Sequence, residues 1–317
     1  MSLAVVQLMR PKQWTKNLLI FAALIFTKSY ADSRLLVLSA LAFAAMCFAS
    51  SAVYALNDVI DAERDRNHPR KKLRPIASGA LSPRVGVLVG LICLVLAIGL
   101  SVAVGVSPLS IPMERGLGGE VRPVVTDFSF AFGVGVYLLI QLGYTFGLKA
   151  VPILDIFIVA TGFVLRAALG AVAIGVGISG WLLLCTGLLA LMLGFAKRRH
   201  EFISQGDERG QSRPSLLGYT RSALDALVIF ASAGAALSYG VYAIESDTAK
   251  HYPALVLTVP VVLYGVMRYL FLVFGREEGG EPENLVFGDL HMILVVFAFL
   301  GLALLALSGF KVGFIGT

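Results

Sequence analysis

Three aspartates that follow an apolar stretch are the residues most able to do chemistry in this chain. Residues 35–56 are apolar and long enough to cross a bilayer, and Asn57, Asp58, Asp61 and Asp65 follow them directly. On a helix the aspartates would share one face, because they lie at positions i, i+3 and i+7. Three like charges on one stripe repel each other unless they share a cation. Since hard oxygen ligands without Cys or His suit Mg²⁺, the segment predicts a magnesium site.

A basic segment follows the aspartates and indicates what the metal would hold. Its cationic residues are Arg64, Arg66, Arg70, Lys71, Lys72 and Arg74. Protein-bound Mg²⁺ is usually held by carboxylates together with substrate phosphates. The pattern therefore predicts a diphosphate site at a membrane surface, with Arg70, Lys72 and Arg74 among the substrate-binding residues. The alternative is a solvated helix end, although aspartates at a helix C-terminus oppose the helix dipole.

The composition of the chain is typical of a protein that lies in a membrane. A hydrophobic fraction of 57%, only 15% charged residues and a mean hydropathy of +0.83 exclude an ordinary soluble domain. Apolar runs of spanning length recur at residues 35–56, 85–106, 128–148, 151–176, 178–196, 223–244, 253–274 and 290–310. Residues 18–31 make a further span only if their helix begins near Pro11 and Lys16 reaches the headgroups. We therefore expect an all-α polytopic membrane protein with nine transmembrane helices, residues 1–317 forming a single domain.

The charges of the loops predict how the chain is oriented. Loops on one side of the nine predicted spans carry 18 Lys and Arg, and those on the other side carry 6. The positive-inside rule then places the N-terminus and the aspartates in the cytoplasm and the C-terminus outside the cell (inner) membrane. The basic N-terminus lacks a small-residue cleavage site, so no signal peptide is expected. Anionic headgroups and phosphorylated substrates explain the pI of 9.3, and no nucleic-acid partner is expected.

A second group of charged residues ends the sixth predicted span. These residues are Lys197, Arg198, Arg199, His200 and Glu201. They could form another phosphate-binding face, with Lys197 and Arg198 on substrate and Glu201 as a further metal ligand. The alternative is a positive-inside anchor in which Lys197 pairs with Glu201 at i,i+4.

Charged residues also lie in the short turn and the span before that group. Tyr144 and Lys149 border the turn, and Asp155 and Arg166 follow in the next span. Intramembrane charges are costly and usually functional, so Asp155 and Arg166 are candidate substrate-binding residues. Tyr144 and Lys149, which border the turn before them, are candidates as well. Asp155 and Arg166 would stand roughly 16 Å apart along a helix, which argues against a direct pair. We expect Asp155 to touch the polar site and Arg166 to hold a lipid phosphate or a helix carbonyl, whereas Lys149 could be only an orientation signal.

Three further groups carry weaker signals. Near the N-terminus, Lys16 and Asn17 could bind substrate or belong to an interfacial anchor with Trp14. An acidic loop is either solvated or lines the site, where it could bind metal; its residues are Glu277, Glu278, Glu281, Glu283 and Asp289. The cysteines are expected to be small buried side chains; they are Cys47, Cys93 and Cys185.

The aspartate segment also carries a resemblance to a known family. Residues 57–65 (NDVIDAERD) and 74–79 (RPIASG) resemble the first signature of the UbiA superfamily of intramembrane prenyltransferases. This resemblance implies nine helices around a central cavity with a cytoplasmic polar cap. It also implies that Mg²⁺, held by Asn57, Asp58, Asp61 and Asp65, grips a diphosphate, and that the aspartates are catalytic.

Other segments narrow the resemblance to one branch. Most members carry a second aspartate-rich motif, where this chain has residues 197–201 (KRRHE). With residues 144–149 (YTFGLK), 162–166 (GFVLR) and 279–283 (GGEPE), it resembles the decaprenyl-phosphate phosphoribosyltransferases. That branch implies transfer of phosphoribosyl from phosphoribosyl diphosphate to a polyprenyl (decaprenyl) phosphate, releasing diphosphate. These substrates bring three anionic groups, which suits the exchange of acidic for basic residues.

Two other functions share part of this pattern. A prenyltransferase that acts on an aromatic or small lipid acceptor would share the metal site but would use a prenyl diphosphate. A transporter would also have many spans, but it should show paired repeats with broken helices, and the sequence has no such repeat. The lipid bilayer is the expected surrounding in each case, and a homo-oligomer is compatible with the sequence.

Overall fold

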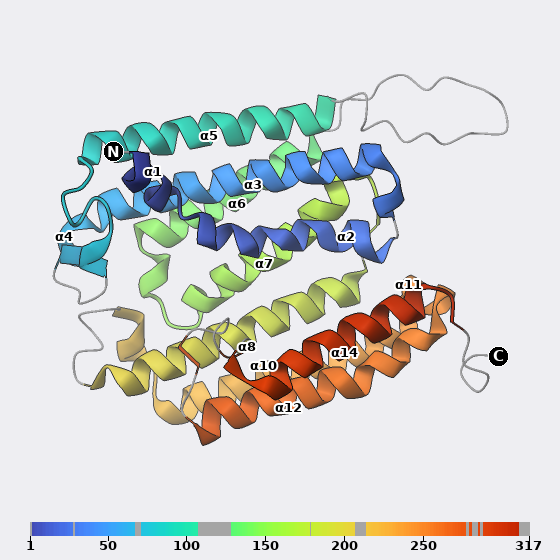
Figure 1. The fold of residues 1–317 in the computed structure, drawn as a ribbon. Coiled ribbons are helices and arrows are strands. Elements are labelled where there is room, and N and C mark those ends of the chain that lie inside the picture. Colours follow the sequence, from blue (N-terminus) through green and yellow to red (C-terminus); the bar gives the residue numbers. More distant parts are fainter. Residues whose placement is uncertain are drawn as a thin grey trace. The chain divides into compact units, whose positions relative to one another are not determined.

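The computed structural model describes an all-helical chain (Figure 1). It covers residues 2–27, 29–66, 71–106, 128–177, 179–206, 214–276, 279–280, 285 and 288–310. Within these ranges there is no β-strand, which confirms the all-α prediction. Eight helices among the described residues are long and apolar enough to cross a membrane. The chain is therefore an integral membrane protein with several membrane-spanning helices.

The eight helices match eight of the predicted spans. They are α3 (Ser33–Ile60), α5 (Pro83–Val106), α6 (Ser129–Phe146), α7 (Leu154–Ala173), α8 (Gly180–Ser204), α10 (Arg221–Glu245), Pro253–Gly275 and α14 (Leu290–Leu307). The seventh combines the 3-10 helix η8 (Pro253–Thr258) with α12 (Val259–Gly275). Large apolar side chains such as Phe132, Leu139 and Phe297 are exposed on these helices, as expected where lipid replaces water.

The ninth predicted span has a different form. Residues of this region fold as the 3-10 helix η1 (Pro11–Ile20), α2 (Phe21–Phe26) and the short 3-10 helix η2 (Ser29–Ala31). Ile20 and Phe21 both have right-handed helical backbone angles, so η1 continues into α2. Because a 3-10 helix rises more per residue, the two together extend for about 29 Å, close to the thickness of the hydrocarbon core. No single α-helix of spanning length forms here, so the count of nine is not confirmed.

The described chain divides into two compact units. The first contains Met1–Phe146 and Leu165–Gly177, and the second contains Gly147–Val164 and Ile178–Thr317. The division falls within α7, whose first half belongs to the second unit and whose second half belongs to the first. Predicted site residues occur in both units, so each unit is described by itself.

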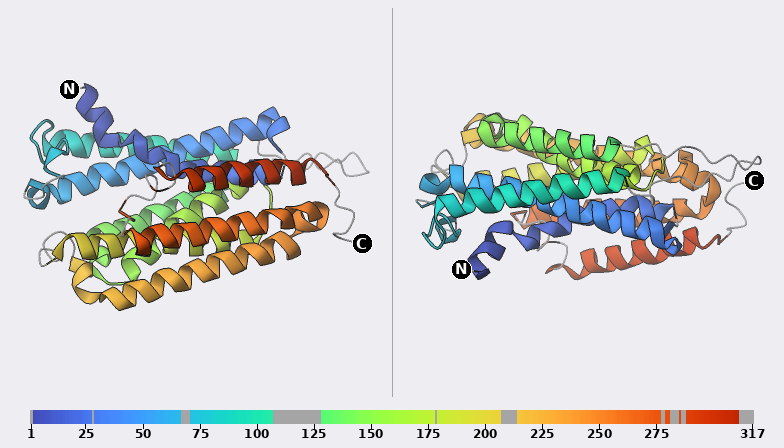
Figure 2. Two further views of the ribbon diagram at one scale, coloured as in Figure 1. Left: turned by 60° about the horizontal axis from the view of Figure 1, so that its bottom comes forward. Right: turned by 90° about the horizontal axis from the view of Figure 1, so that it is seen from above.

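Small residues set the packing of the first unit. Buried alanines at helical spacing line α3, and α5 runs beside that helix (Figure 2). Gly170 of α7 lies against the backbone of η1, because a Cβ at this position would sit 2.1 Å from the carbonyl oxygen of Ile20. Only glycine allows so close an approach, which brings this part of α7 next to η1. The approach places Arg166, one turn earlier, beside Asn17.

Apolar packing and helix caps hold the second unit together. In Figures 1 and 2, α8 lies beside α10, α10 beside α12 and α12 beside α14. Phe195, Leu224 and Tyr269 belong to the buried core that these helices share with Ile156 of α7. Side chains accept hydrogen bonds at the N-termini of α10, α11 (Asp247–His251) and α14; they are Thr220, Ser246 and Asp289. Such caps satisfy backbone N–H groups that have no partner within their helix.

Candidate active site

The aspartates stand where α3 ends and the short helix α4 (Ala62–Arg66) begins. The aspartates do not lie on one continuous helix, because α3 ends at Ile60 and Asp61 has non-helical backbone angles (φ −88°, ψ 5°). The chain nevertheless keeps helical hydrogen bonds from Asp61 N to Asn57 O (2.9 Å) and from Asp65 N to Asp61 O (2.8 Å). The register of a helix is thus preserved through the break, and both Asp58 and Asp65 are buried.

Two arginines bind these carboxylates. Arg74 Nη1 lies 2.6 Å from Asp65 Oδ2 and 3.3 Å from Asp58 Oδ1. The guanidinium of Arg10 donates to the same Asp58 Oδ1. We call these four residues the acidic cluster. Two carboxylates this close repel each other unless cations lie between them. Here those cations are the guanidinium groups of Arg10 and Arg74.

The carboxylates of the acidic cluster are suitable ligands for a hard divalent cation. Among the described residues, the buried Asp58 Oδ2 has no hydrogen-bond partner, so it offers a free acceptor. Asn57, Asp61 and Asp65 add further oxygen donors nearby in the chain, the ligand type that Mg²⁺ prefers. However, no three or more His, Cys, Asp or Glu side chains of the described ranges are already grouped to hold a metal. The carboxylates of Asp58 and Asp65 are paired with arginines instead.

The basic segment after α4 contributes one cation to the acidic cluster. That cation is Arg74, which the sequence predicted to bind substrate. Lys72, in the 3-10 helix η3 (Lys71–Leu73), is exposed. Arg70 lies outside the described residues. The proposed role of Arg70 and Lys72 on the diphosphate thus stays a prediction.

Arg166 lies in a buried polar group of the first unit. Its Nε donates to Asn17 Oδ1 (2.6 Å) and its Nη2 donates to the hydroxyl of Tyr137 (2.9 Å). Asn17 in turn donates to Cys47 Sγ (3.2 Å) and to Ser50 Oγ (3.4 Å). Arg166 was expected to hold a lipid phosphate or a helix carbonyl, and the partners found here are side chains. Asn17 is fully buried, whereas its neighbour Lys16 is half-buried.

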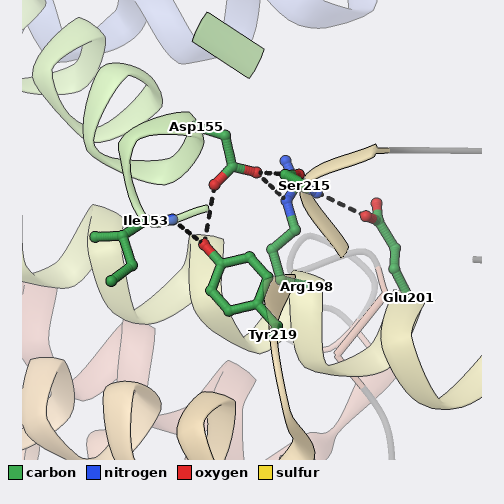
Figure 3. Close-up of polar contacts among 6 residues, drawn as sticks. All are labelled: Ile153, Asp155, Arg198, Glu201, Ser215 and Tyr219. Atoms are coloured by element: carbon green, nitrogen blue, oxygen red, sulfur yellow. Dashed lines mark hydrogen bonds and ion pairs between the residues drawn. The ribbon is translucent and has the colours of Figure 1, made fainter. Parts of the chain in front are cut away.

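The second unit builds a different cluster around Asp155 at the start of α7 (Figure 3). Asp155 Oδ2 accepts from Arg198 Nε (2.8 Å) and from Ser215 Oγ (3.1 Å), and Oδ1 accepts from the Tyr219 hydroxyl (3.0 Å). We call these four residues the Asp155 cluster. Asp155 has no exposed surface and Arg198 is 4% exposed. Both carboxylate oxygens have partners, so Asp155 holds protein groups in place.

Tyr219 joins this cluster to a strained turn. Ile153 has a positive φ of 68°, which is rare for a β-branched residue and marks strain. Its backbone N–H donates to the Tyr219 hydroxyl, which itself donates to Asp155. Burial raises the pKa of Tyr219, so the phenol stays protonated and remains a donor. The cluster therefore fixes the turn that leads into α7.

The remaining predicted residues of the second unit have mixed surroundings. Glu201 accepts from Arg198 Nη1 (2.7 Å), where the sequence left a pair with Lys197 open. Lys197 is exposed, and Lys149, in the 3-10 helix η5 (Leu148–Ala150), is half-buried. In the first unit, Tyr144 of α6 is also half-buried. Neither lysine is buried, and their predicted role in binding substrate stays a prediction.

One residue of the acidic loop is described together with its partner. Asp289 caps α14 and pairs with Arg268, whose Nη2 lies 2.6 Å from Asp289 Oδ2. The hydrogen bond from Arg268 lowers the pKa of Asp289 to about 2. This aspartate is therefore engaged at a helix end. The other acidic residues of the loop lie outside the described residues; they are Glu277, Glu278, Glu281 and Glu283.

The sequence analysis missed three residues that complete these clusters. Arg10 was given no role at the site, and Ser215 and Tyr219 carried no signal at all. They reach their partners across 48, 60 and 64 residues of chain. The only usable sign was the Arg10-Pro11 pair, since a residue before proline is pushed out of the right-handed helical region.

Comparison with known proteins agrees with this architecture. The sequence pattern of the UbiA prenyltransferase family matches residues 18–113. The decaprenyl-phosphate phosphoribosyltransferase of Corynebacterium glutamicum is 33% identical over 90% of this chain and 80% of its own length. That of Mycolicibacterium smegmatis is 30% identical, over 93% and 90%. A solved UbiA homolog from Archaeoglobus fulgidus, bound to GPP and Mg²⁺, has a TM-score of 0.69 at 17% identity and covers 96% of this chain and 99% of its own.

The all-helical membrane fold and the aspartates at the end of an early span are what the relatives' family predicts. The chain belongs to the UbiA prenyltransferase family. Within that family it is a transferase similar to the decaprenyl-phosphate phosphoribosyltransferases, as the resemblance of its sequence segments predicted.

Proposed function

We propose that this enzyme transfers a 5-phosphoribosyl group from phosphoribosyl diphosphate to a polyprenyl phosphate and releases diphosphate. A phosphate oxygen of the lipid forms the new bond to the anomeric carbon of ribose, and the bond from that carbon to the diphosphate breaks. One feature carries the choice of substrates. Basic residues stand at the end of α8, in a chain that enzymes named for this reaction match along most of its length.

The acidic cluster is assigned to the leaving group. Asn57, Asp58, Asp61 and Asp65 would hold Mg²⁺ through oxygen atoms, and the unpartnered Asp58 Oδ2 supports this assignment. A divalent cation held there supplies Lewis-acid stabilisation of the departing diphosphate. Arg74, together with Arg70 and Lys72, adds positive charge where negative charge develops.

The basic residues of the second unit are assigned to the remaining phosphates. Lys149 and Lys197 would bind the 5-phosphate or the phosphate of the lipid, because both are cationic and neither residue is buried. Arg198 is held by Asp155 and Glu201, so its role is to fix the end of α8. The lipid phosphate is already ionised, so the reaction needs no strong general base. This agrees with an acidic cluster that contains no histidine.

The orientation in the membrane belongs to the same proposal. The excess of Lys and Arg on one side places the N-terminus and the acidic cluster in the cytoplasm. If residues 11–26 cross the bilayer as a ninth span, the C-terminus lies outside. A reporter fused to the C-terminus would test this, because activity of the reporter in the cytoplasm would contradict nine crossings.

A transfer assay tests the function itself. Purified protein in lipid vesicles would receive phosphoribosyl diphosphate, labelled in the ribose, with polyprenyl phosphate and Mg²⁺. We expect label in the lipid fraction, a product mass equal to the lipid plus phosphoribosyl, and no product when EDTA is present. Label that enters the lipid in EDTA would overturn the metal role. A prenyl diphosphate that supports transfer to an aromatic acceptor, with no transfer from phosphoribosyl diphosphate, would overturn the choice of donor.

A further inference from the structure

Arg10 occupies an unusual place between two helices. It lies between α1 (Ser2–Met9) and η1, with left-handed backbone angles (φ 55°, ψ 59°). A non-glycine residue adopts these angles at a cost, and they persist only where the surroundings impose them. Pro11 follows directly, and the residue before a proline is kept out of the right-handed helical region. This backbone conformation therefore indicates that the surroundings hold Arg10 in one position.

Contacts with α3 fix the turn at Arg10. Leu8 is fully buried in an apolar group that includes Ala55 of α3. The Trp14 indole donates to Ser51 Oγ (3.1 Å), and Ser51 Oγ donates to the carbonyl of Met9 (2.8 Å). The residues before and after Arg10 are thus both tied to α3.

The side chain of Arg10 is held as well. Its guanidinium carbon lies 4.8 Å from the ring centre of Tyr54, one turn before Asp58 on α3. From this position it donates to Asp58 Oδ1, and Arg74 Nη1 lies 3.3 Å from the same oxygen. One carboxylate oxygen therefore has two cations while Asp58 Oδ2 has no partner. Two guanidinium groups satisfy this carboxylate incompletely.

The arginines of the acidic cluster are more exposed than the carboxylates that they bind. The side chains of Arg10 and Arg74 are 24% and 28% exposed, whereas those of Asp58 and Asp65 are 1% and 2% exposed. A guanidinium that turns away from the acidic cluster can be hydrated, but a buried carboxylate that loses its cation cannot. The carboxylates thus need some cation at all times, and the arginines need not be that cation.

We infer that Arg10 and Arg74 are exchangeable counter-ions of the acidic cluster. They occupy the carboxylates until a divalent cation arrives with a diphosphate, and they then turn to the diphosphate oxygens. The charges balance, because two guanidinium charges leave the carboxylates and one doubly charged cation replaces them. No bond other than ion pairs and hydrogen bonds is made or broken. This inference rests on the proposed metal–diphosphate role of the acidic cluster, and it predicts that metal and diphosphate bind together.

Metal binding without substrate tests the exchange directly. Free Mn²⁺ would be titrated by electron paramagnetic resonance into purified protein, with and without inorganic pyrophosphate. We expect weak Mn²⁺ binding alone and much tighter binding with pyrophosphate. Removing the competing charge in Arg10→Gln or Arg74→Gln should tighten Mn²⁺ binding alone by roughly tenfold. The same changes should reduce the tightening that pyrophosphate gives, because a guanidinium group is lost from the diphosphate.

Arg66→Gln provides a matched control for this titration. Arg66 is an exposed arginine of α4 next to Asp65, so its replacement removes the same charge nearby without removing an ion pair of the cluster. Arg74→Lys keeps the charge and should bind Mn²⁺ as the unaltered protein does. Melting of each variant in detergent confirms that it is folded.

The exchange is overturned if neither Arg10→Gln nor Arg74→Gln binds Mn²⁺ more tightly than the unaltered protein. It is also overturned if Arg66→Gln gives an equal gain. Because the probes are a metal and pyrophosphate, these results do not depend on the identity of the sugar donor. A failed transfer assay would thus leave the exchange standing, and a failed exchange would leave the transfer reaction standing.

Discussion

The acidic cluster and the Asp155 cluster use the same residue types in two different ways. In both, an arginine binds a buried aspartate. In the acidic cluster the arginine side chains are about a quarter exposed and Asp58 Oδ2 has no partner. In the Asp155 cluster the Arg198 side chain is 5% exposed, and both oxygens of Asp155 accept hydrogen bonds. An incompletely satisfied carboxylate can accept a new ligand, whereas a fully satisfied one holds the fold.

The largest difference between the clusters should be in activity, which depends on the carboxylates of the acidic cluster. Asp58→Asn or Asp65→Asn removes a charge that would bind the metal, and we expect kcat/KM to fall by about 10²–10³-fold or more. Initial rates of transfer to the lipid at saturating Mg²⁺ measure the effect. Glu63→Gln is the matched control, because Glu63 is an exposed acid of the same short helix. Normal turnover in both aspartate variants would remove the basis for a metal site here.

Changes in folding stability should be larger for the Asp155 cluster than for the acidic cluster. Asp155→Ala leaves the Arg198 guanidinium buried without its main carboxylate partner, which costs about 3–5 kcal/mol of folding free energy. Asp58→Asn should cost less, because Arg10 and Arg74 can turn to water. Unfolding of the purified variants in mixed micelles compares the two changes. If Asp58→Asn proved the more destabilising, the two clusters would not differ as we describe.

The sequence predicted the fold and the aspartates of the acidic cluster more fully than it predicted the Asp155 cluster. Apolar runs predicted the eight long helices, and the spacing of the aspartates predicted the two carboxylates of the acidic cluster, because both patterns are local. Arg10 of that cluster was not predicted. Asp155 was recognised as a costly intramembrane charge, but its partners were not. Ser215 and Tyr219 come from a segment 60 or more residues away, and only tertiary folding brings them to α7.

The α-helix break at Asp61 and the 3-10 form of η1 could not be predicted for a related reason. Periodicity gives the face on which side chains lie, and that face survives a break when hydrogen bonds such as Asp65 N to Asp61 O persist. Periodicity does not predict the rise per residue. A segment that extends at the 3-10 rise has the same apolar residues as an α-helix but covers more distance.

A smaller effect should follow from the strained turn of the Asp155 cluster. Tyr219→Phe removes the hydroxyl that accepts from Ile153 N–H and donates to Asp155, which should cost about 1–3 kcal/mol. Ile153→Gly in the same background should recover about 1 kcal/mol, because glycine adopts a positive φ without strain. Unfolding in mixed micelles measures both changes.

Ile153→Ala is the control for this recovery. It removes the same side chain, which is 44% exposed, but keeps a Cβ and therefore the strain. An equal recovery with alanine and glycine would show that the positive φ stores no strain, and that Tyr219 is not needed to hold it.

The smallest effect should come from a third aspartate–arginine pair, Asp289 with Arg268, which lies at a helix end. Asn can also cap a helix, so Asp289→Asn mainly removes the charge. Since the folded pKa of Asp289, about 2, lies below its usual value of 3.8, the ionised group stabilises the fold above pH 4. That contribution is lost as the pH falls through 2. The melting temperature of Asp289→Asn should therefore lie below that of the unaltered protein by a constant amount from pH 8 to 5, and the gap should close in stronger acid. A gap that widened on acidification would mean that the pair with Arg268 does not hold Asp289 in the ionised form.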